Sequence, residues 1–170
     1  MNTLAGRLTE IQARMTRAAE KAGRRPEAIR LIAVSKTKPV SLIREAIAAG
    51  VTELGENYIQ EARDKIPRIK GEVAWHFIGH LQKNKAKFAA ALFSWVHTID
   101  SPGIAEVLDR RAGMEGRHLN ILIEVNVGKE ATKSGVLEEG LIPLAEHVAG
   151  LANLSLRGLM VIPPITADSE

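Results

Sequence analysis

Short apolar runs alternate with stretches of helical periodicity along most of the chain. In the first stretch, Leu4, Leu8, Ile11 and Met15 recur at spacings of three and four residues, and Gly23 marks its end. Six apolar runs follow, at residues 30–34, 52–54, 74–78, 95–99, 119–125 and 154–160. Between them lie helix candidates at 39–49, 57–69, 83–92, 101–112 and 137–149. Strands that alternate with helices indicate a parallel sheet covered by helices.

Two architectures have this order of elements: an open doubly wound sheet and a (β/α)8 barrel. The doubly wound sheet usually carries a glycine-rich phosphate loop after its first strand, but residues 35–39 contain no glycine. Polar residues instead gather where the apolar runs end, which is where a barrel places its working residues. We therefore predict an α/β fold of the parallel (β/α)8 TIM-barrel type.

The chain is short for a complete barrel, which takes roughly 250 residues and rarely fewer than about 200. Its 170 residues account for about six β/α units. We therefore expect residues 1–170 to form a single barrel domain that is truncated after these units and incomplete at the C-terminus. Residues 163–170 have the composition of a loop that leads into a further helix.

Composition excludes several classes of function. The net charge of +3 is too small to argue for nucleic acid, although it suits an anionic ligand such as a phosphate. The chain has no cysteine, which excludes a disulfide framework, a thiolate nucleophile and a cysteine-bound zinc. The N-terminus lacks the apolar core of a signal peptide, and no apolar stretch approaches about 18 residues. We expect a cytoplasmic protein without a membrane span.

Lys36 follows the first apolar run directly and is the first candidate for chemistry. A lysine at this point of a barrel points towards its mouth, where desolvation and the like charge of Lys38 favour the neutral amine. A neutral amine is what imine formation with an aldehyde requires. The alternative is a solvated lysine in a loop.

Glu56 and Asn57 follow the second run, after Gly55. Either side chain could cap the next helix. The amide of Asn57 could instead hydrogen-bond a ligand hydroxyl or hold the lysine.

His76 and His80 lie four residues apart, a spacing that binds metals on a helix. Here His76 belongs to a strand and His80 to a loop, and no third ligand is evident, so we predict no metal site. We expect His76 to be a hydrogen-bonding residue beneath the pocket.

The lysines at 83, 85 and 87 have the pattern of a solvated helix face. Residues 124–126 end the fifth run, and the polar, glycine-bounded segment 128–135 that follows suits a rim loop over a pocket or a plain surface loop.

Four motifs together resemble the YggS/PROSC family of pyridoxal 5′-phosphate (PLP) homeostasis proteins. They are AVSKTKP at 33–39, GENY at 55–58, WHFIGHLQKNK at 75–85 and GLM at 158–160. The motifs occur in the order of the family and at the ends of the predicted strands, and the resemblance runs from the first helix to residue 170.

The resemblance implies a single-domain barrel similar to the N-terminal domain of alanine racemases. It identifies Lys36 as the Schiff-base residue that holds PLP as an internal aldimine, with Asn57 and His76 as cofactor-binding residues near it. It implies a role in intracellular PLP homeostasis, with PLP-dependent apo-enzymes as candidate recipients. It also implies further strands, a Ser/Gly-containing phosphate-binding loop and an arginine facing the pyridine nitrogen, for which residues 1–170 hold no counterpart.

Two other functions remain open from the sequence. A PLP-dependent amino-acid racemase needs a second base opposite the lysine, and the chain has one tyrosine, Tyr58, and no second domain to close the site. A barrel aldolase would use the lysine for an imine with a sugar-derived carbonyl, but the context at 35–39 and the histidine motif argue against it. We favour a PLP carrier without turnover.

Overall fold

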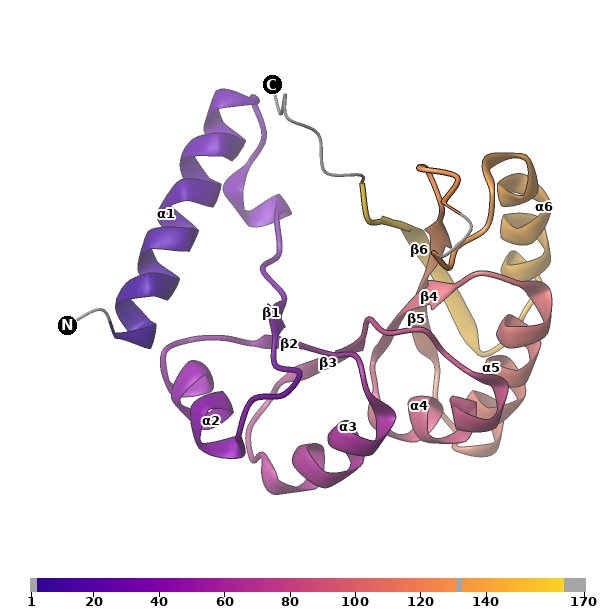
Figure 1. The fold of residues 1–170 in the computed structure, drawn as a ribbon, viewed down its shortest axis with the longest axis horizontal. Coiled ribbons are helices and arrows are strands. Elements are labelled where there is room, and N and C mark those ends of the chain that lie inside the picture. Colours follow the sequence, from indigo (N-terminus) through magenta and orange to yellow (C-terminus); the bar gives the residue numbers. More distant parts are fainter. Residues whose placement is uncertain (1–2, 131–132, 164–170) are drawn as a thin grey trace.

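The computed structural model describes residues 3–130 and 133–163. It contains a six-stranded sheet whose strands follow the chain order β1-β2-β3-β4-β5-β6, all pairs being parallel. The strands are β1 (Ala33–Val34), β2 (Glu53–Glu56), β3 (Ala74–Phe77), β4 (Trp95–Ile99), β5 (Leu119–Val125) and β6 (Leu154–Val161). Sequential parallel strands with helices on the outer side are the arrangement of a β/α barrel (Figure 1). The predicted parallel β/α architecture is therefore confirmed.

The helices lie between the strands, as the periodicity predicts. They are α1 (Leu4–Lys21), α2 (Val40–Ala48), α3 (Ile59–Lys65), α4 (Ala86–Leu92), α5 (Pro102–Met114) and α6 (Glu138–Ala149), with 3-10 turns η1 (Pro26–Ala28), η2 (Ile66–Arg68) and η3 (Lys83–Lys85). The expected helix 57–69 is shorter than predicted, because Pro67 lies in the 3-10 turn that follows Lys65. The expected capping role of Glu56 or Asn57 is wrong, since the residue before α3 is Tyr58 and no side chain caps this helix.

The main core lies between the sheet and the helices that cover it. Its largest fully buried side chains include Phe77 and Phe93, whose rings meet edge to face with centroids 5.3 Å apart. Leu119, Ile121 and Ile123 alternate along β5 with less than 1% exposure each and supply its helix-facing side. This alternation places every second side chain of a strand in the core and leaves the others on the inner face of the sheet.

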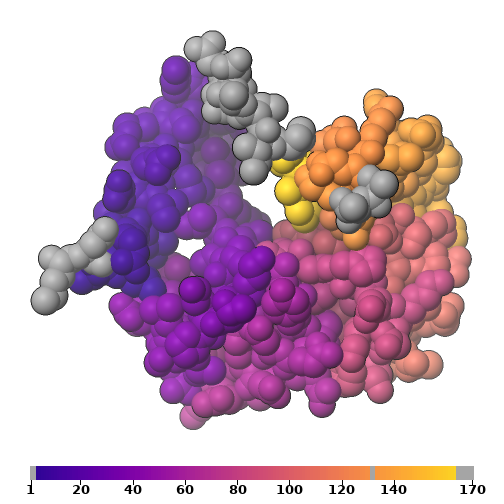
Figure 2. Space-filling model, in the orientation of Figure 1, coloured from indigo at the N-terminus to yellow at the C-terminus, as the bar shows by residue number. Residues whose placement is uncertain are grey.

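Strand β1 is shorter than the apolar run 30–34 that predicts it. Among the described residues it pairs with β2 alone, so only one side of it has ladder hydrogen bonds. The exposed fraction of Val34 is 49%, because no neighbouring strand covers its inner side in the described chain. In the space-filling view the molecule opens between the N-terminal segment and β6 (Figure 2).

The inner face of the sheet carries polar and aromatic side chains. His76, Trp95 and His97 contact one another there, and Arg157 of β6 donates a hydrogen bond to Asn120 of β5 at 2.7 Å. A polar inner face can hold a polar ligand, whereas the layer between sheet and helices is mostly apolar.

Within the described ranges, none of the helices combines the length and the apolar character that crossing a membrane requires. Residues 164–170, where the sequence predicts the start of a further helix, lie outside the described part of the chain.

Candidate functional site

Lys36 lies in the turn that follows β1, at the carboxyl edge of the sheet. The turn is fixed to β2 because the Ser35 N–H donates to the Gly55 carbonyl at 2.8 Å, and it closes through Lys38 N–H to the Ser35 carbonyl at 3.1 Å. The side chain of Lys36 is exposed. The expected desolvation of this amine is therefore wrong for the described chain, because the inner side of β1 is open.

Asn57 lies at the matching position of the next strand. Val34 pairs with Gly55, so Lys36 and Asn57 each come two residues after that pair, at the ends of neighbouring strands. The Asn57 Oδ1 atom is buried and has no hydrogen-bond partner within the described chain. A buried amide oxygen without a partner is costly, so this atom is suited to accept a hydrogen bond from a ligand or an amine.

The ends of β2 and β3 approach each other closely beside Asn57. A Cβ atom added to Gly79 would overlap the Asn57 carbonyl. Glycine is therefore required in the third motif so that the two backbones can meet at the site.

His76 lies deeper on the inner face, level with Gly55 and Val34 rather than with Lys36. Its Nε2 is 2.6 Å from Glu53 Oε2 and its Nδ1 is 2.9 Å from His97 Nε2. Its ring stacks on Trp95, with centroids 5.6 Å apart and 13° between the planes. Both ring nitrogens are thus engaged by protein partners, and His76 supports the site from beneath.

The two histidines are held in the neutral form. Burial lowers the pKa of His76, although the Glu53 carboxylate opposes the shift. Burial, with a smaller effect of His76, lowers the pKa of His97 to about 4. The described residues include no group of three His, Cys, Asp or Glu side chains that could hold a metal ion.

A second polar group gathers at the ends of β4 and β5. Glu124 is 8% exposed, and its Oε2 has no hydrogen-bond partner in the part of the chain that the structure describes. Burial, and then the charge of Asp100, raise the pKa of Glu124. His80 Nδ1 lies 3.8 Å from Asp100 Oδ2 and 3.1 Å from the Ser134 hydroxyl, which brings the loop after β5 over this edge.

Asn126 organises that loop. Its amide nitrogen donates to the Glu130 carbonyl at 2.8 Å, and its Oδ1 accepts from the Glu130 N–H at 3.2 Å. The loop after β5, for which the sequence allowed either a rim loop or a surface loop, is therefore anchored next to the site.

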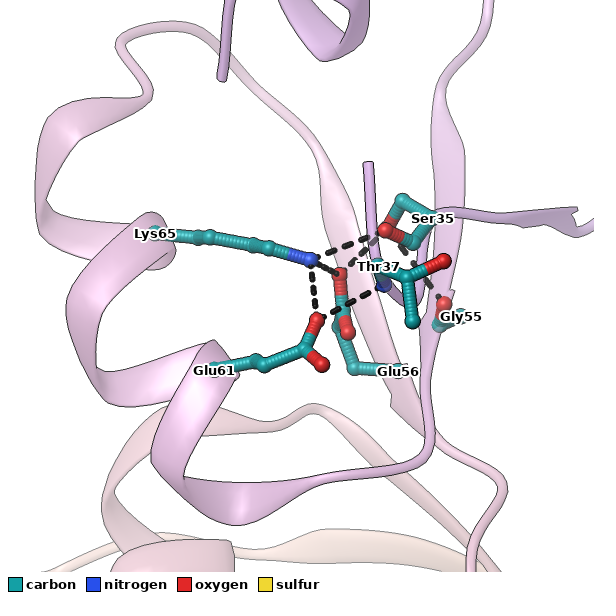
Figure 3. A network of polar contacts seen from close by, with 6 residues as sticks. All are labelled: Ser35, Thr37, Gly55, Glu56, Glu61 and Lys65. Atoms are coloured by element: carbon teal, nitrogen blue, oxygen red, sulfur yellow. Dashed lines mark hydrogen bonds and ion pairs between the residues drawn. The ribbon is translucent and has the colours of Figure 1, made fainter. Parts of the chain in front are cut away.

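A network of polar contacts that the sequence pattern did not predict holds the Lys36 turn from the helix side (Figure 3). Lys65 of α3 donates to Glu56 Oε1 at 3.0 Å, to Glu61 Oε2 at 2.7 Å and to the Ser35 carbonyl at 2.9 Å. The Ser35 hydroxyl donates to Glu56 Oε1 at 2.7 Å, and the Thr37 N–H donates to Glu61 Oε2 at 2.8 Å. The sequence offered a signal only for the Glu61–Lys65 ion pair, because residues four apart on a helix lie on the same face.

Comparison with known proteins identifies the family. Residues 7–170 match the family described as "Alanine racemase, N-terminal domain". The pyridoxal phosphate homeostasis protein of Pseudomonas aeruginosa is 46% identical over 169 residues, which cover 99% of this chain and 74% of that protein. The protein of the same name in Escherichia coli K12 is 47% identical over 167 residues, covering 96% of this chain and 71% of the relative.

Solved structures agree with these relatives. PipY of Synechococcus elongatus, solved with PLP bound, superposes with a TM-score of 0.77 at 38% identity, over 89% of this chain and 71% of that one. An alanine racemase of Clostridium difficile shares the fold, with a TM-score of 0.67 at 14% identity over 78% of this chain and 35% of that one. The fold and site thus define a barrel of the alanine racemase N-terminal type. Within that class, the chain belongs to the family of pyridoxal phosphate homeostasis proteins.

Proposed function

We propose that this protein binds PLP at the carboxyl edge of the barrel, with Lys36 as its covalent attachment point, and serves intracellular PLP homeostasis. The observation that carries the proposal is the pairing of an accessible amine, Lys36, with the unpartnered amide oxygen of Asn57 at the ends of adjacent strands. The related PipY structure contains PLP, and the relatives are named for PLP homeostasis.

The described residues fit such a ligand. PLP supplies an aldehyde, which condenses with an amine and links the ligand to the protein. Lys36 would provide the amine, and the buried Oδ1 of Asn57 would accept a hydrogen bond at the same edge. His76 would act from one layer below, because Glu53 and His97 already occupy its two ring nitrogens.

We propose a binding and delivery role, with PLP-dependent apo-enzymes as recipients and residues 1–170 as the lysine-bearing part of one barrel domain. Racemisation requires a base on each side of the reacting carbon. Tyr58, the only tyrosine of the chain, has an exposed fraction of 51% and follows Asn57 at the open edge.

Borohydride trapping tests the attachment. The full-length protein is incubated with PLP, reduced and digested, and the modified peptide is identified by mass spectrometry. We expect the label on Lys36, its loss in Lys36→Ala, and its persistence in Lys87→Ala, which removes an exposed lysine of α4. Equal labelling of Lys36→Ala and the native protein would refute the proposal. Racemase activity is tested separately by the optical rotation of alanine at high protein concentration, where we expect no change.

A further inference from the structure

The Lys36 turn has a second set of partners on the side of the sheet that faces α3. Glu56 is fully buried, Lys65 is 9% exposed, and the Lys65 ammonium lies within 3.0 Å of three oxygen atoms. The Lys65 ammonium is thus shared between the carboxyl groups of Glu56 and Glu61 and the Ser35 carbonyl. The Ser35 hydroxyl and the Thr37 N–H supply the additional donors.

Stability alone does not account for such a cluster. Burying an ion pair costs desolvation that its attraction often only offsets, so well-packed apolar side chains would serve stability equally well. The cluster instead contacts the residues on both sides of Lys36. Ser35 is held through its carbonyl and its hydroxyl, and Thr37 is held through its backbone N–H.

The backbone conformation of Thr37 needs such a stabilising contact. Its φ is +62°, in the left-handed region that β-branched residues rarely adopt. Such a conformation persists only where the surroundings impose it. The Thr37 N–H donates a hydrogen bond to the Glu61 carboxylate, which in turn accepts one from Lys65 (Figure 3).

We infer that the Glu56–Lys65–Glu61 cluster is a positioning device that sets the backbone of the Lys36 turn and thereby aims the amine at PLP. The inference rests on the proposed function. None of the three side chains needs to touch the ligand, because they act through Ser35 and Thr37.

The first test is the rate of PLP labelling at Lys36 in the full-length protein. We expect Lys65→Met to slow labelling roughly ten- to a hundredfold, the loss that a displacement of about 1 Å in a reacting group causes. Arg63→Met is the matched control, because it removes one positive charge from the same helix, where the guanidinium lies over Phe88 rather than in the cluster. We expect it to label at the native rate. Thermal unfolding monitors folding in each variant.

Glu61→Ala provides a second route if Lys65→Met does not fold. The Glu61 side chain is 30% exposed, and its removal leaves Lys65 bonded to Glu56 and Ser35. It removes the acceptor of the Thr37 N–H. We expect slower labelling at Lys36 and faster hydrogen exchange of the Thr37 amide in the protein without PLP.

A double-variant cycle separates positioning from general loosening. Glycine adopts a positive φ without strain, so Thr37→Gly should remove most of the need for the cluster. In the T37G background we expect Lys65→Met to change labelling by less than about threefold, which makes the two effects non-additive. Native labelling rates in folded Lys65→Met and Glu61→Ala would overturn the inference. Absence of label on native Lys36 would instead overturn the proposed function, while Thr37 amide exchange would still report on the cluster.

Discussion

Glu124 is a carboxyl group that the fold buries without compensating it. It comes from the end of β5, its Oε2 has no partner among the described residues, and burial raises its pKa. A carboxyl whose folded pKa is raised binds a proton more tightly in the folded protein than in the unfolded chain. Its contribution to stability therefore falls as pH rises above the unfolded value of 4.5.

Glu124→Gln should consequently stabilise the protein at neutral pH. We expect the free energy of unfolding to rise by about 1 kcal/mol, because the glutamine amide keeps the shape of the carboxyl group but carries no charge that burial must desolvate. The gain should shrink as pH falls towards 4.5 and vanish below it, because both states are then protonated. Urea unfolding at pH 7 and pH 4 measures this. Glu146→Gln on the exposed face of α6 should change stability little at either pH. A loss of stability in Glu124→Gln at pH 7 would contradict the claim that burial of the ionised Glu124 side chain destabilises the protein.

Single residues differ in how far the sequence reveals them. Lys36 and Asn57 could be proposed because each follows an apolar run, and strand ends carry function in a barrel, whereas His76 could be proposed because it is a polar residue inside a run. The exposure of Lys36 could not be predicted, because it depends on which strand covers β1. Lys65 was missed because its partners come from three segments, and nothing in its own stretch marks it as buried.

Beside the Lys36 turn that follows β1, the site is formed by the strand pair β2 and β3. Their register aligns Gly55 with His76, and their ends converge where Gly79 passes the Asn57 carbonyl. The alternation of apolar runs and helical periods predicted both strands, but register and close approach arise from tertiary packing. The end of α3 also depends on the structure: the helical periodicity predicted a helix to residue 69, but α3 ends at Lys65.

Gly79→Ala tests the close approach of these two strands. The added methyl group would overlap the Asn57 carbonyl, so the strand ends must separate. We expect the free energy of unfolding to fall by about 1–3 kcal/mol, the usual cost of overpacking. Gly150→Ala is the matched control, because its φ is −83° and its nearest neighbour lies at an ordinary 3.5 Å. It should stabilise the protein by about 0.4–1 kcal/mol. Chemical denaturation of both variants measures these changes. An unchanged free energy of unfolding in Gly79→Ala would contradict the close approach of Gly79 to the Asn57 carbonyl.

At the scale of the whole molecule, the sheet separates two environments. Its outer side packs an apolar core against the helices, apart from the Glu56–Lys65–Glu61 cluster, and its inner side holds the His76–His97 pair beside Glu53 and Trp95. The hydrophobic pattern predicted the outer layer well, because core burial follows period and composition. It could not predict that His76 and His97 would meet, since they lie 21 residues apart on different strands.

This interior makes the protein sensitive to acid. The unfolded chain protonates its histidines below about pH 6.5, whereas folded His97 stays neutral down to about pH 4 and the pKa of His76 is also lowered. The unfolded state therefore binds more protons in this window, so stability is present above pH 6.5 and is lost as pH falls towards 4. Glu61 acts in the same direction at lower pH, because its folded pKa lies below 4.5, while Glu124 acts against it.

We expect the urea midpoint of the native protein to fall steadily between pH 6.5 and 4. In His97→Gln the slope over this interval should be shallower, because one of the two buried groups that resist protonation is gone. If His97→Gln kept the full slope while remaining folded, the acid sensitivity would not come from His97.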